Sequence, residues 1–221
     1  MHDSVNKLIS IKKEILEFIG GKSKNSDDVN IIAVSKTFPM NDILPLINYG
    51  HIHFGENKIQ EALEKWTDIK NDFAHIQLHM IGKLQTNKVK YAINLFDYIH
   101  SLDSLKLAEK ISSEQNKQKK NVKIFIQVNI GQELQKGGVQ IDELENFYQI
   151  CSTKLGLNII GLMCLPPDNC EALPYFKKIK NLNEGLNLQD LSIGMSGDYM
   201  ESLKCKSTFI RIGSAIFGKR S

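Results

Sequence analysis

The sequence lacks the features that mark several large classes of protein. Its 221 residues contain no apolar run approaching the roughly 18 residues that a membrane-spanning helix needs. The first four residues lack the basic and apolar regions of a secretory signal peptide. Lysine and arginine number 28 against 25 aspartates and glutamates, an excess too small to indicate a nucleic-acid partner. We therefore expect a cytoplasmic protein that works without a membrane and without nucleic acid.

Cysteine is scarce, and its placement excludes further classes. The four cysteines show no C-x-x-C spacing, so they predict neither a zinc site nor a redox pair. At this chain length, reduced thiols in a reducing compartment are expected. His51 and His53 are two residues apart, but no third ligand clusters with them, so we predict no metal. The sequence also contains neither the G-x-x-x-x-G-K-[ST] loop nor G-x-G-x-x-G after a strand.

Strand-like and helix-like segments alternate along the whole chain. An amphipathic helix over residues 1–20 precedes the first strand and ends at a pair of glycines. Such alternation is typical of a parallel sheet covered by helices. We predict an α/β protein with a single domain over residues 1–221, folded as a (β/α)8 TIM-type barrel. Periodicity alone leaves a doubly wound open sheet as the alternative. The predicted strands cover residues 31–34, 51–54, 76–81, 96–100, 122–130, 159–165, 191–195 and 208–212.

Glycine and serine follow the last two predicted strands, at Ser196-Gly197 and Gly213-Ser214. In both architectures the functional site lies at the carboxyl ends of the strands. Glycine lets the backbone approach an anion closely, and serine adds a hydroxyl donor. The pattern indicates a phosphate site, with simple tight turns as the alternative explanation.

Lys36 lies at the end of the first predicted strand, which closes in Ser35-Lys36-Thr37. Desolvation or a nearby cation would make its amine nucleophilic toward an aldehyde. Together with a phosphate site, this suggests pyridoxal 5′-phosphate (PLP). From Lys36 alone, an ordinary solvated lysine is the better explanation. Arg211 on the last strand would keep a pyridine nitrogen unprotonated and weaken the ring as an electron sink, or it could pair with a carboxylate. His79 is expected in the core.

Taken together, these stretches resemble the pyridoxal phosphate homeostasis protein family, whose barrel is similar to the N-terminal domain of alanine racemase. The resemblance runs from about residue 30 to residue 218, with matches at the strand ends throughout. The matching stretches are residues 33–37, 54–57, 60–62, 79–88, 101–104, 127–130, 136–139, 161–163, 191–198 and 207–218.

The resemblance implies a role for individual residues. Lys36 matches the lysine that holds PLP as an internal imine, and Arg211 matches the arginine facing the pyridine nitrogen. Phe38 and Lys58 depart from the family, whose members often carry lysine and tyrosine there, which puts ring contacts at these positions in doubt. The remaining matched positions are Asn57 near the ring, Lys136 in cofactor handling, and the phosphate-binding Ser196, Gly213 and Ser214, of which Ser214 replaces a commoner threonine.

The resemblance also implies a function: binding and delivery of PLP in its intracellular homeostasis, as a monomer, without catalytic turnover. PLP-dependent apoenzymes are the implied partners. A PLP-dependent racemase is the main alternative, but it needs a second β-rich domain, which we do not expect because the chain ends at Ser221. A phosphate-binding isomerase without a cofactor is a further alternative, with His79 or Glu56 as its base.

Overall fold

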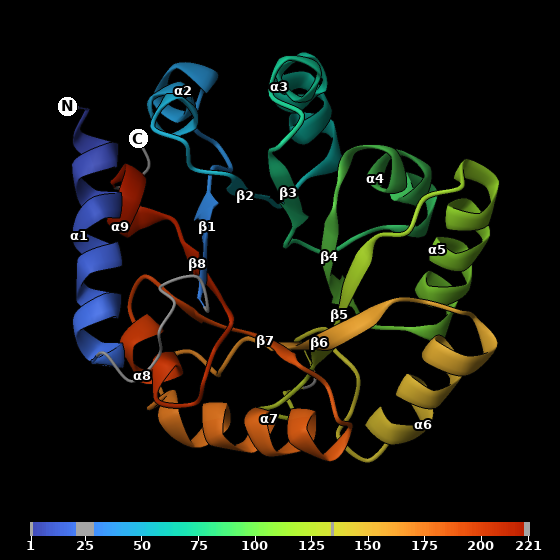
Figure 1. Ribbon diagram of the computed structural model, residues 1–221. Coiled ribbons are helices and arrows are strands. Elements are labelled where there is room, and N and C mark those ends of the chain that lie inside the picture. The colour runs from blue at the N-terminus through green and yellow to red at the C-terminus, as the bar shows by residue number, and fades with distance from the viewer. Residues whose placement is uncertain (1, 21–28, 134, 219–221) are drawn as a thin grey trace.

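The computed structural model describes residues 2–20, 29–133 and 135–218. Eight parallel strands pair in chain order, and β8 pairs with β1 to close a barrel (Figure 1). This closure confirms the predicted barrel over the open sheet. The strands are β1 (Asn30–Val34), β2 (His53–Glu56), β3 (Gln77–Met80), β4 (Tyr98–Leu102), β5 (Lys123–Val128), β6 (Ile159–Cys164), β7 (Asp190–Met195) and β8 (Phe209–Ile212).

Helices surround the barrel on its outside (Figure 1). Helix α1 (Asp3–Ile19) buries Val5, Leu8, Ile11 and Ile15, and the chain leaves it at Gly20 with φ of 59°. Within the described ranges, no helix combines the length and the apolar character needed to cross a membrane. The others are α2 (Met40–Asn48), α3 (Ile59–Asp72), α4 (Val89–Leu95) after the 3₁₀ turn η2 (Thr86–Lys88), α5 (Leu105–Gln118), α6 (Leu144–Gln149), α7 (Leu173–Gly185), α8 (Tyr199–Leu203) and α9 (Ser214–Phe217).

Two local features differ from the sequence prediction. Helix α6 continues into a π-helical turn, η3 (Ile150–Lys154), where the hydroxyls of Ser152 and Thr153 donate to carbonyls four residues earlier. A pattern search at 3.6 residues per turn does not detect such a turn. The second strand begins at His53, two residues later than predicted, because pairing to β1 through Phe54 and Gly55 sets its position.

The interior of the barrel contains aromatic and histidine side chains. A small apolar cluster comprises Ile32, Tyr98, Phe125, Met163 and Phe209. Two histidines are fully buried among these rings. The ring centroid of His79 lies 4.2 Å from that of Tyr98, and the centroid of His100 lies 4.3 Å from that of Phe125, both stacked. The expected core position of His79 is confirmed.

Burial keeps four histidines of the barrel neutral: His51, His53, His79 and His100. It lowers the pKa of His51 to about 3, with further repulsion from Lys12 and His53. It lowers the pKa of His53 to about 4, helped by Lys123 and opposed by Asp97. The pKa values of His79 and His100 also lie well below the ordinary value, chiefly because of burial. Protonation of any of these imidazoles therefore favours the unfolded chain.

We expect the free energy of unfolding to fall between pH 7 and pH 5. Below pH 6.5 the unfolded chain binds protons that the native barrel does not, so stability decreases as pH decreases, by about 1.4 kcal/mol per histidine and pH unit. Urea unfolding at several pH values measures this slope. The variant His75→Gln is the control, because His75 is exposed, and it should show the same slope. A free energy of unfolding that is constant from pH 7 to pH 5 would contradict the prediction.

Candidate functional site

A cavity of about 590 Å³ opens at the carboxyl ends of the strands. It brings together five of the seven residues selected from the sequence: Lys36, Ser196, Arg211, Gly213 and Ser214. They come from the loops after β1, β7 and β8 and from β8 itself, which are neighbours in the closed barrel. The other described residues that line the cavity are Val34, Phe38, Ile81, Leu165, Met195, Gly197 and Gly218.

One part of the cavity is built from serine hydroxyls and backbone N–H groups. The Ser196 hydroxyl oxygen accepts from the N–H groups of Gly213 and Ala215, at 3.2 and 3.3 Å. These donors lie at the start of α9, directly after β8. The arrangement collects hydrogen-bond donors at one spot, which is what a bound phosphate oxygen requires.

The two glycines in this part of the cavity are not there for turn geometry. Neither Gly197 nor Gly213 has a positive φ. A Cβ atom at Gly197 would meet nothing within 4 Å, and one at Gly213 would make only an ordinary contact with Val34 at 3.4 Å. By contrast, Gly194 has φ of 93° and no room for a Cβ beside Ser202. Gly194, inside β7, is therefore required by its own backbone and by Ser202, whereas Gly197 and Gly213 leave space in the cavity for a ligand.

Arg211 is buried against the barrel wall with its guanidinium at the cavity. Its Nη1 donates to the carbonyl and the hydroxyl of Ser192, both at 2.7 Å, and its Nη2 donates to the carbonyl of Cys164 at 3.1 Å. Among the described residues no carboxylate pairs with it. Burial lowers the pKa of Arg211 from its usual value, but arginine remains a cation at neutral pH.

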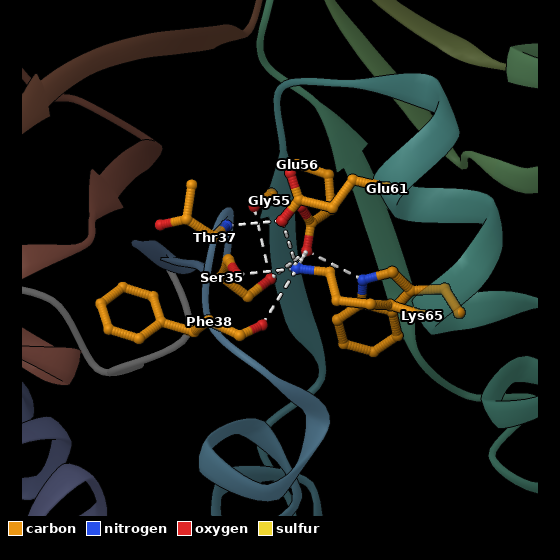
Figure 2. A network of polar contacts seen from close by, with 8 residues as sticks. Ser35, Thr37, Phe38, Gly55, Glu56, Glu61 and Lys65 are labelled. Atoms are coloured by element: carbon orange, nitrogen blue, oxygen red, sulfur yellow. Dashed lines mark hydrogen bonds and ion pairs between the residues drawn. The ribbon is translucent and has the colours of Figure 1, made fainter. Parts of the chain in front are cut away.

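Lys36 lies in a turn, whereas the sequence suggested a strand end. Strand β1 ends at Val34, and Thr37 adopts φ of 68°, a left-handed conformation that is unfavourable for a branched residue by about 1 kcal/mol or more. A hydrogen bond from the Thr37 N–H to the Glu61 carboxylate of α3 stabilises this conformation (Figure 2). The strained turn sets where Lys36 enters the cavity.

The ammonium of Lys65, also on α3, fixes the same turn (Figure 2). It donates to the carbonyls of Ser35 and Phe38 at 2.9 and 3.3 Å. It also pairs with Glu61 at 2.9 Å and with Glu56 at 2.7 Å. We call this group of Ser35, Glu56, Glu61 and Lys65 the lysine clamp. It holds both sides of Lys36 from a helix packed on the barrel.

Glu56 is the buried anion of the lysine clamp. Its side chain is 0% exposed, and its Oε1 accepts from the Ser35 hydroxyl at 2.7 Å and from the Trp66 indole at 3.0 Å. It does not line the cavity, and neither does His79. The isomerase alternative, which needed one of these two as a base in the site, is therefore not supported.

Asn57 and Lys136, the other two selected residues, lie outside the cavity lining. The Oδ1 atom of Asn57 is buried and makes no hydrogen bond to the described residues. The ammonium of Lys136 pairs with Glu133 at 2.9 Å and donates to the carbonyl of Pro166 at 3.2 Å, which links the loops after β5 and β6. A ligand could satisfy the Asn57 oxygen, whereas Lys136 is already engaged in the loops.

Phe38 and Lys58, where the sequence departs from the family, have different surroundings. Phe38 stacks on Phe217 with ring centroids 4.8 Å apart and forms an apolar wall of the cavity. Lys58 is exposed and precedes α3. Sequence reasoning missed the Phe38–Phe217 wall and the lysine clamp. The spacing of Glu61 and Lys65 by four residues was the one available signal for the clamp.

Replacing Lys65 by methionine should destabilise the protein by about 3 kcal/mol or more, because Glu56 would remain as a buried charge without its cation. The control is Lys70→Met on the same helix. Lys70 pairs with Asp97 at 2.6 Å, but these side chains are 20% and 32% exposed, against 12% and 0% for Lys65 and Glu56. We expect a loss of about 1 kcal/mol or less there. Urea unfolding measures both losses, and equal losses would contradict the role of the clamp.

Comparison with known proteins gives the family. The model of the alanine racemase N-terminal domain matches residues 21–221. The pyridoxal phosphate homeostasis protein of Haemophilus influenzae is 33% identical over 90% of this chain and 89% of its own. The structure of PipY from Synechococcus elongatus with PLP bound is 32% identical, with a TM-score of 0.81 over 92% of this chain and all of that one.

A more distant likeness shows the fold alone. Alanine racemase from Corynebacterium glutamicum is 14% identical, with a TM-score of 0.69 over 97% of this chain and 61% of that one. The similarity of the barrels agrees with the fold expected from the sequence. The family match and the closer relatives together cover nearly the whole chain. The chain therefore belongs to the alanine racemase N-terminal domain family and, within it, to the pyridoxal phosphate homeostasis proteins.

Proposed function

We propose that this chain binds PLP covalently through Lys36 and takes part in its intracellular homeostasis. The observation that carries the proposal is the convergence in one cavity of an amine, a buried guanidinium and a cluster of serine and N–H donors. These groups match an aldehyde, a pyridine nitrogen and a phosphate. The structure of PipY with PLP bound supports the same assignment.

The phosphate would be held by the hydroxyls of Ser196 and Ser214 and by the N–H of Gly213. The absence of a Cβ at Gly213, where ordinary backbone geometry would allow one, fits a site that needs close approach to the backbone. Near the ring, the buried Asn57 oxygen without a described partner is a further candidate contact. Lys136 would handle the cofactor from the adjoining loops without lining its cavity.

Lys36 would supply the covalent link. Its Nζ would hold the cofactor through a carbon–nitrogen double bond to the aldehyde carbon, with one water molecule released. The lysine clamp favours this step because it fixes the residues on both sides of Lys36, so that the amine is oriented before the cofactor arrives. When bound, the cofactor supplies an electron-withdrawing ring, and the residues around it determine how strongly that ring withdraws electrons.

The variant Lys36→Ala should lose the visible absorption band of the bound cofactor and keep its fold, because Lys36 lies in a turn outside the core. Borohydride reduction of the wild-type protein should make the link permanent, and peptide mass spectrometry should locate it at Lys36. The control Lys58→Ala removes an exposed lysine after β2 and should retain the band. An adduct found mainly on Lys136 or another lysine would overturn the assignment.

We also propose that the bound cofactor supports no turnover. Arg211 is a permanent cation that cannot share a proton with the pyridine nitrogen, so the ring withdraws electrons weakly. Apart from the Lys36 amine, the described residues that line the cavity offer no carboxylate, imidazole or phenol as a base. Removal of an α-proton from an amino acid requires both a base and a strong electron sink. The names of the curated relatives, as homeostasis proteins, support this proposal.

Exchange of amino-acid α-protons in deuterated water is the sensitive test, because it detects proton removal even without product. We expect no exchange at enzyme-like rates with common amino acids. Sustained exchange that disappears in Lys36→Ala would support the racemase alternative. The Lys36→Ala protein also serves as the control for exchange caused by free PLP.

Delivery to PLP-dependent apoenzymes completes the proposed function. The exposed large apolar side chains include Leu165 and Met195, which lie at the cavity and are available to a partner that takes up the cofactor. The others are spread over four parts of the fold, which favours a monomer: Leu16 and Phe18 on α1, Tyr49 after α2, Tyr91 on α4 and Leu105 on α5. All four cysteines are free thiols, as expected in the cytoplasm.

A further inference from the structure

We propose that Ser192, His100, His79 and His53 form a hydrogen-bond chain of fixed direction that positions the guanidinium of Arg211. In this inference Ser192 and His100 are positioning residues that act through Arg211. Their effect on PLP rests on the proposed function above. The direction of the hydrogen bonds does not, because it follows from the protein alone.

The chain is continuous inside the barrel. Arg211 Nη1 lies 2.7 Å from Ser192 Oγ, and Ser192 Oγ lies 2.9 Å from His100 Nδ1. His100 Nε2 lies 2.9 Å from His79 Nδ1, and His79 Nε2 lies 3.0 Å from His53 Nδ1. The five residues come from β8, β7, β4, β3 and β2. His79, His100 and Ser192 are each fully buried, so these contacts have no competition from solvent.

Arg211 determines the direction of every bond. A guanidinium has donors only, so Ser192 Oγ must accept from it. Ser192 Oγ could also accept a second bond, but its own buried hydroxyl proton needs an acceptor, and His100 Nδ1 is its other partner among the described contacts, so His100 Nδ1 accepts. A neutral imidazole has one donor and one acceptor, so His100 donates from Nε2 to His79 Nδ1. The same rule makes His79 donate from Nε2 to His53 Nδ1. All three histidines therefore carry their proton on Nε2.

The histidines have to be neutral for this order to hold. Burial lowers the pKa of all three, and the charge of Arg211 lowers the pKa of His100 further. A protonated histidine would place a second donor against a neighbour that is already donating to it, which gives an independent reason for the neutral state.

The chain stabilises the charge of Arg211 without neutralising it. Each imidazole turns its electron-rich Nδ1 toward Arg211, so the dipoles of three rings favour a cation at that end. A carboxylate partner would give a tighter contact but would reduce the positive potential facing the cavity. Two carbonyls and one hydroxyl fix the guanidinium on its barrel side, at Ser192 and Cys164. The described contacts leave further N–H donors of Arg211 for a ligand in the cavity.

The chain runs the length of the barrel. Arg211 lines the cavity at the carboxyl ends of the strands, and His53 is the first residue of β2, at the amino end. Phe125, Tyr98 and Phe209 pack against the imidazoles and restrict their rotation. Apolar packing therefore holds the rings in the order that the hydrogen bonds require.

Nitrogen-15 NMR of the histidine side chains tests the direction in the protein without cofactor. We expect a protonated Nε2 and an unprotonated Nδ1 for His53, His79 and His100 at pH 7. A proton on Nδ1 of any of them would overturn the proposed direction of the hydrogen bonds. This measurement does not involve PLP, so its outcome is independent of the proposed function.

Binding of PLP to Ser192→Ala tests the positioning role. We expect the dissociation constant to rise about tenfold, the size of effect from losing one hydrogen bond to a charged group, and the tautomer of His100 to change. Ser192→Thr keeps the hydroxyl and should restore both readouts, which separates positioning from packing. His51→Asn is the control, because His51 is also buried, but it packs on Phe54 and hydrogen-bonds to the backbone carbonyl of His53, with no side-chain hydrogen bond to the four residues of the proposed chain. It should bind PLP as the wild type does.

The outcomes separate the two proposals. Wild-type affinity in Ser192→Ala, or no recovery in Ser192→Thr, would overturn the positioning role. Wild-type affinity in Arg211→Met would instead show that Arg211 does not contact the cofactor, and would overturn its role in the proposed function. Expected tautomers together with weakened binding in both Ser192→Ala and Arg211→Met support the inference.

Discussion

Pairing of β8 with β1 is the constraint on which the site depends. Four residue pairs join these strands, from Asn30 with Phe209 to Ala33 with Ile212. This register places the end of β1 beside Gly213, and the turn that carries Lys36 beside the serines after β7 and β8. An open sheet would separate the first and last strands and would leave the amine and the donor cluster far apart. Closure therefore creates the cavity.

Two polar networks support this cavity from opposite sides of the barrel wall. The lysine clamp acts from outside, through α3, and uses charge: a buried carboxylate and an ammonium that also donates to two carbonyls. The histidine chain acts from inside and uses neutral donors and acceptors around one cation. The clamp tolerates charge because each charge has a partner of opposite sign. The interior holds an unpaired cation because many oriented dipoles surround it.

The sequence predicted the closed barrel and most of the candidate site. Alternating apolar runs located the eight strands to within about two residues, because burial on both faces leaves a strong local signal. Lys36, Arg211 and the glycine–serine pairs were found because side chains after parallel strands converge at one end of the fold. The sequence did not predict the π-helical turn after α6, whose hydroxyl–carbonyl bonds follow no apolar period. It placed Lys36 at a strand end because nothing local signals the positive φ of Thr37.

By itself, then, the sequence determined the order of the elements, the class of barrel and the residue types at the strand ends, since these follow from local periodicity and from chain order. Only the tertiary structure decided which polar groups meet. Glu56 and Lys65 are nine residues apart, whereas His100 and Ser192 are 92 residues apart, and their contacts depend on barrel register and helix packing. The tertiary structure also distinguished the glycines. The backbone conformation at Gly194 requires a glycine, whereas the conformations at Gly197 and Gly213 do not. Distances between side chains are set by the whole closed sheet, and no local pattern in the sequence records them.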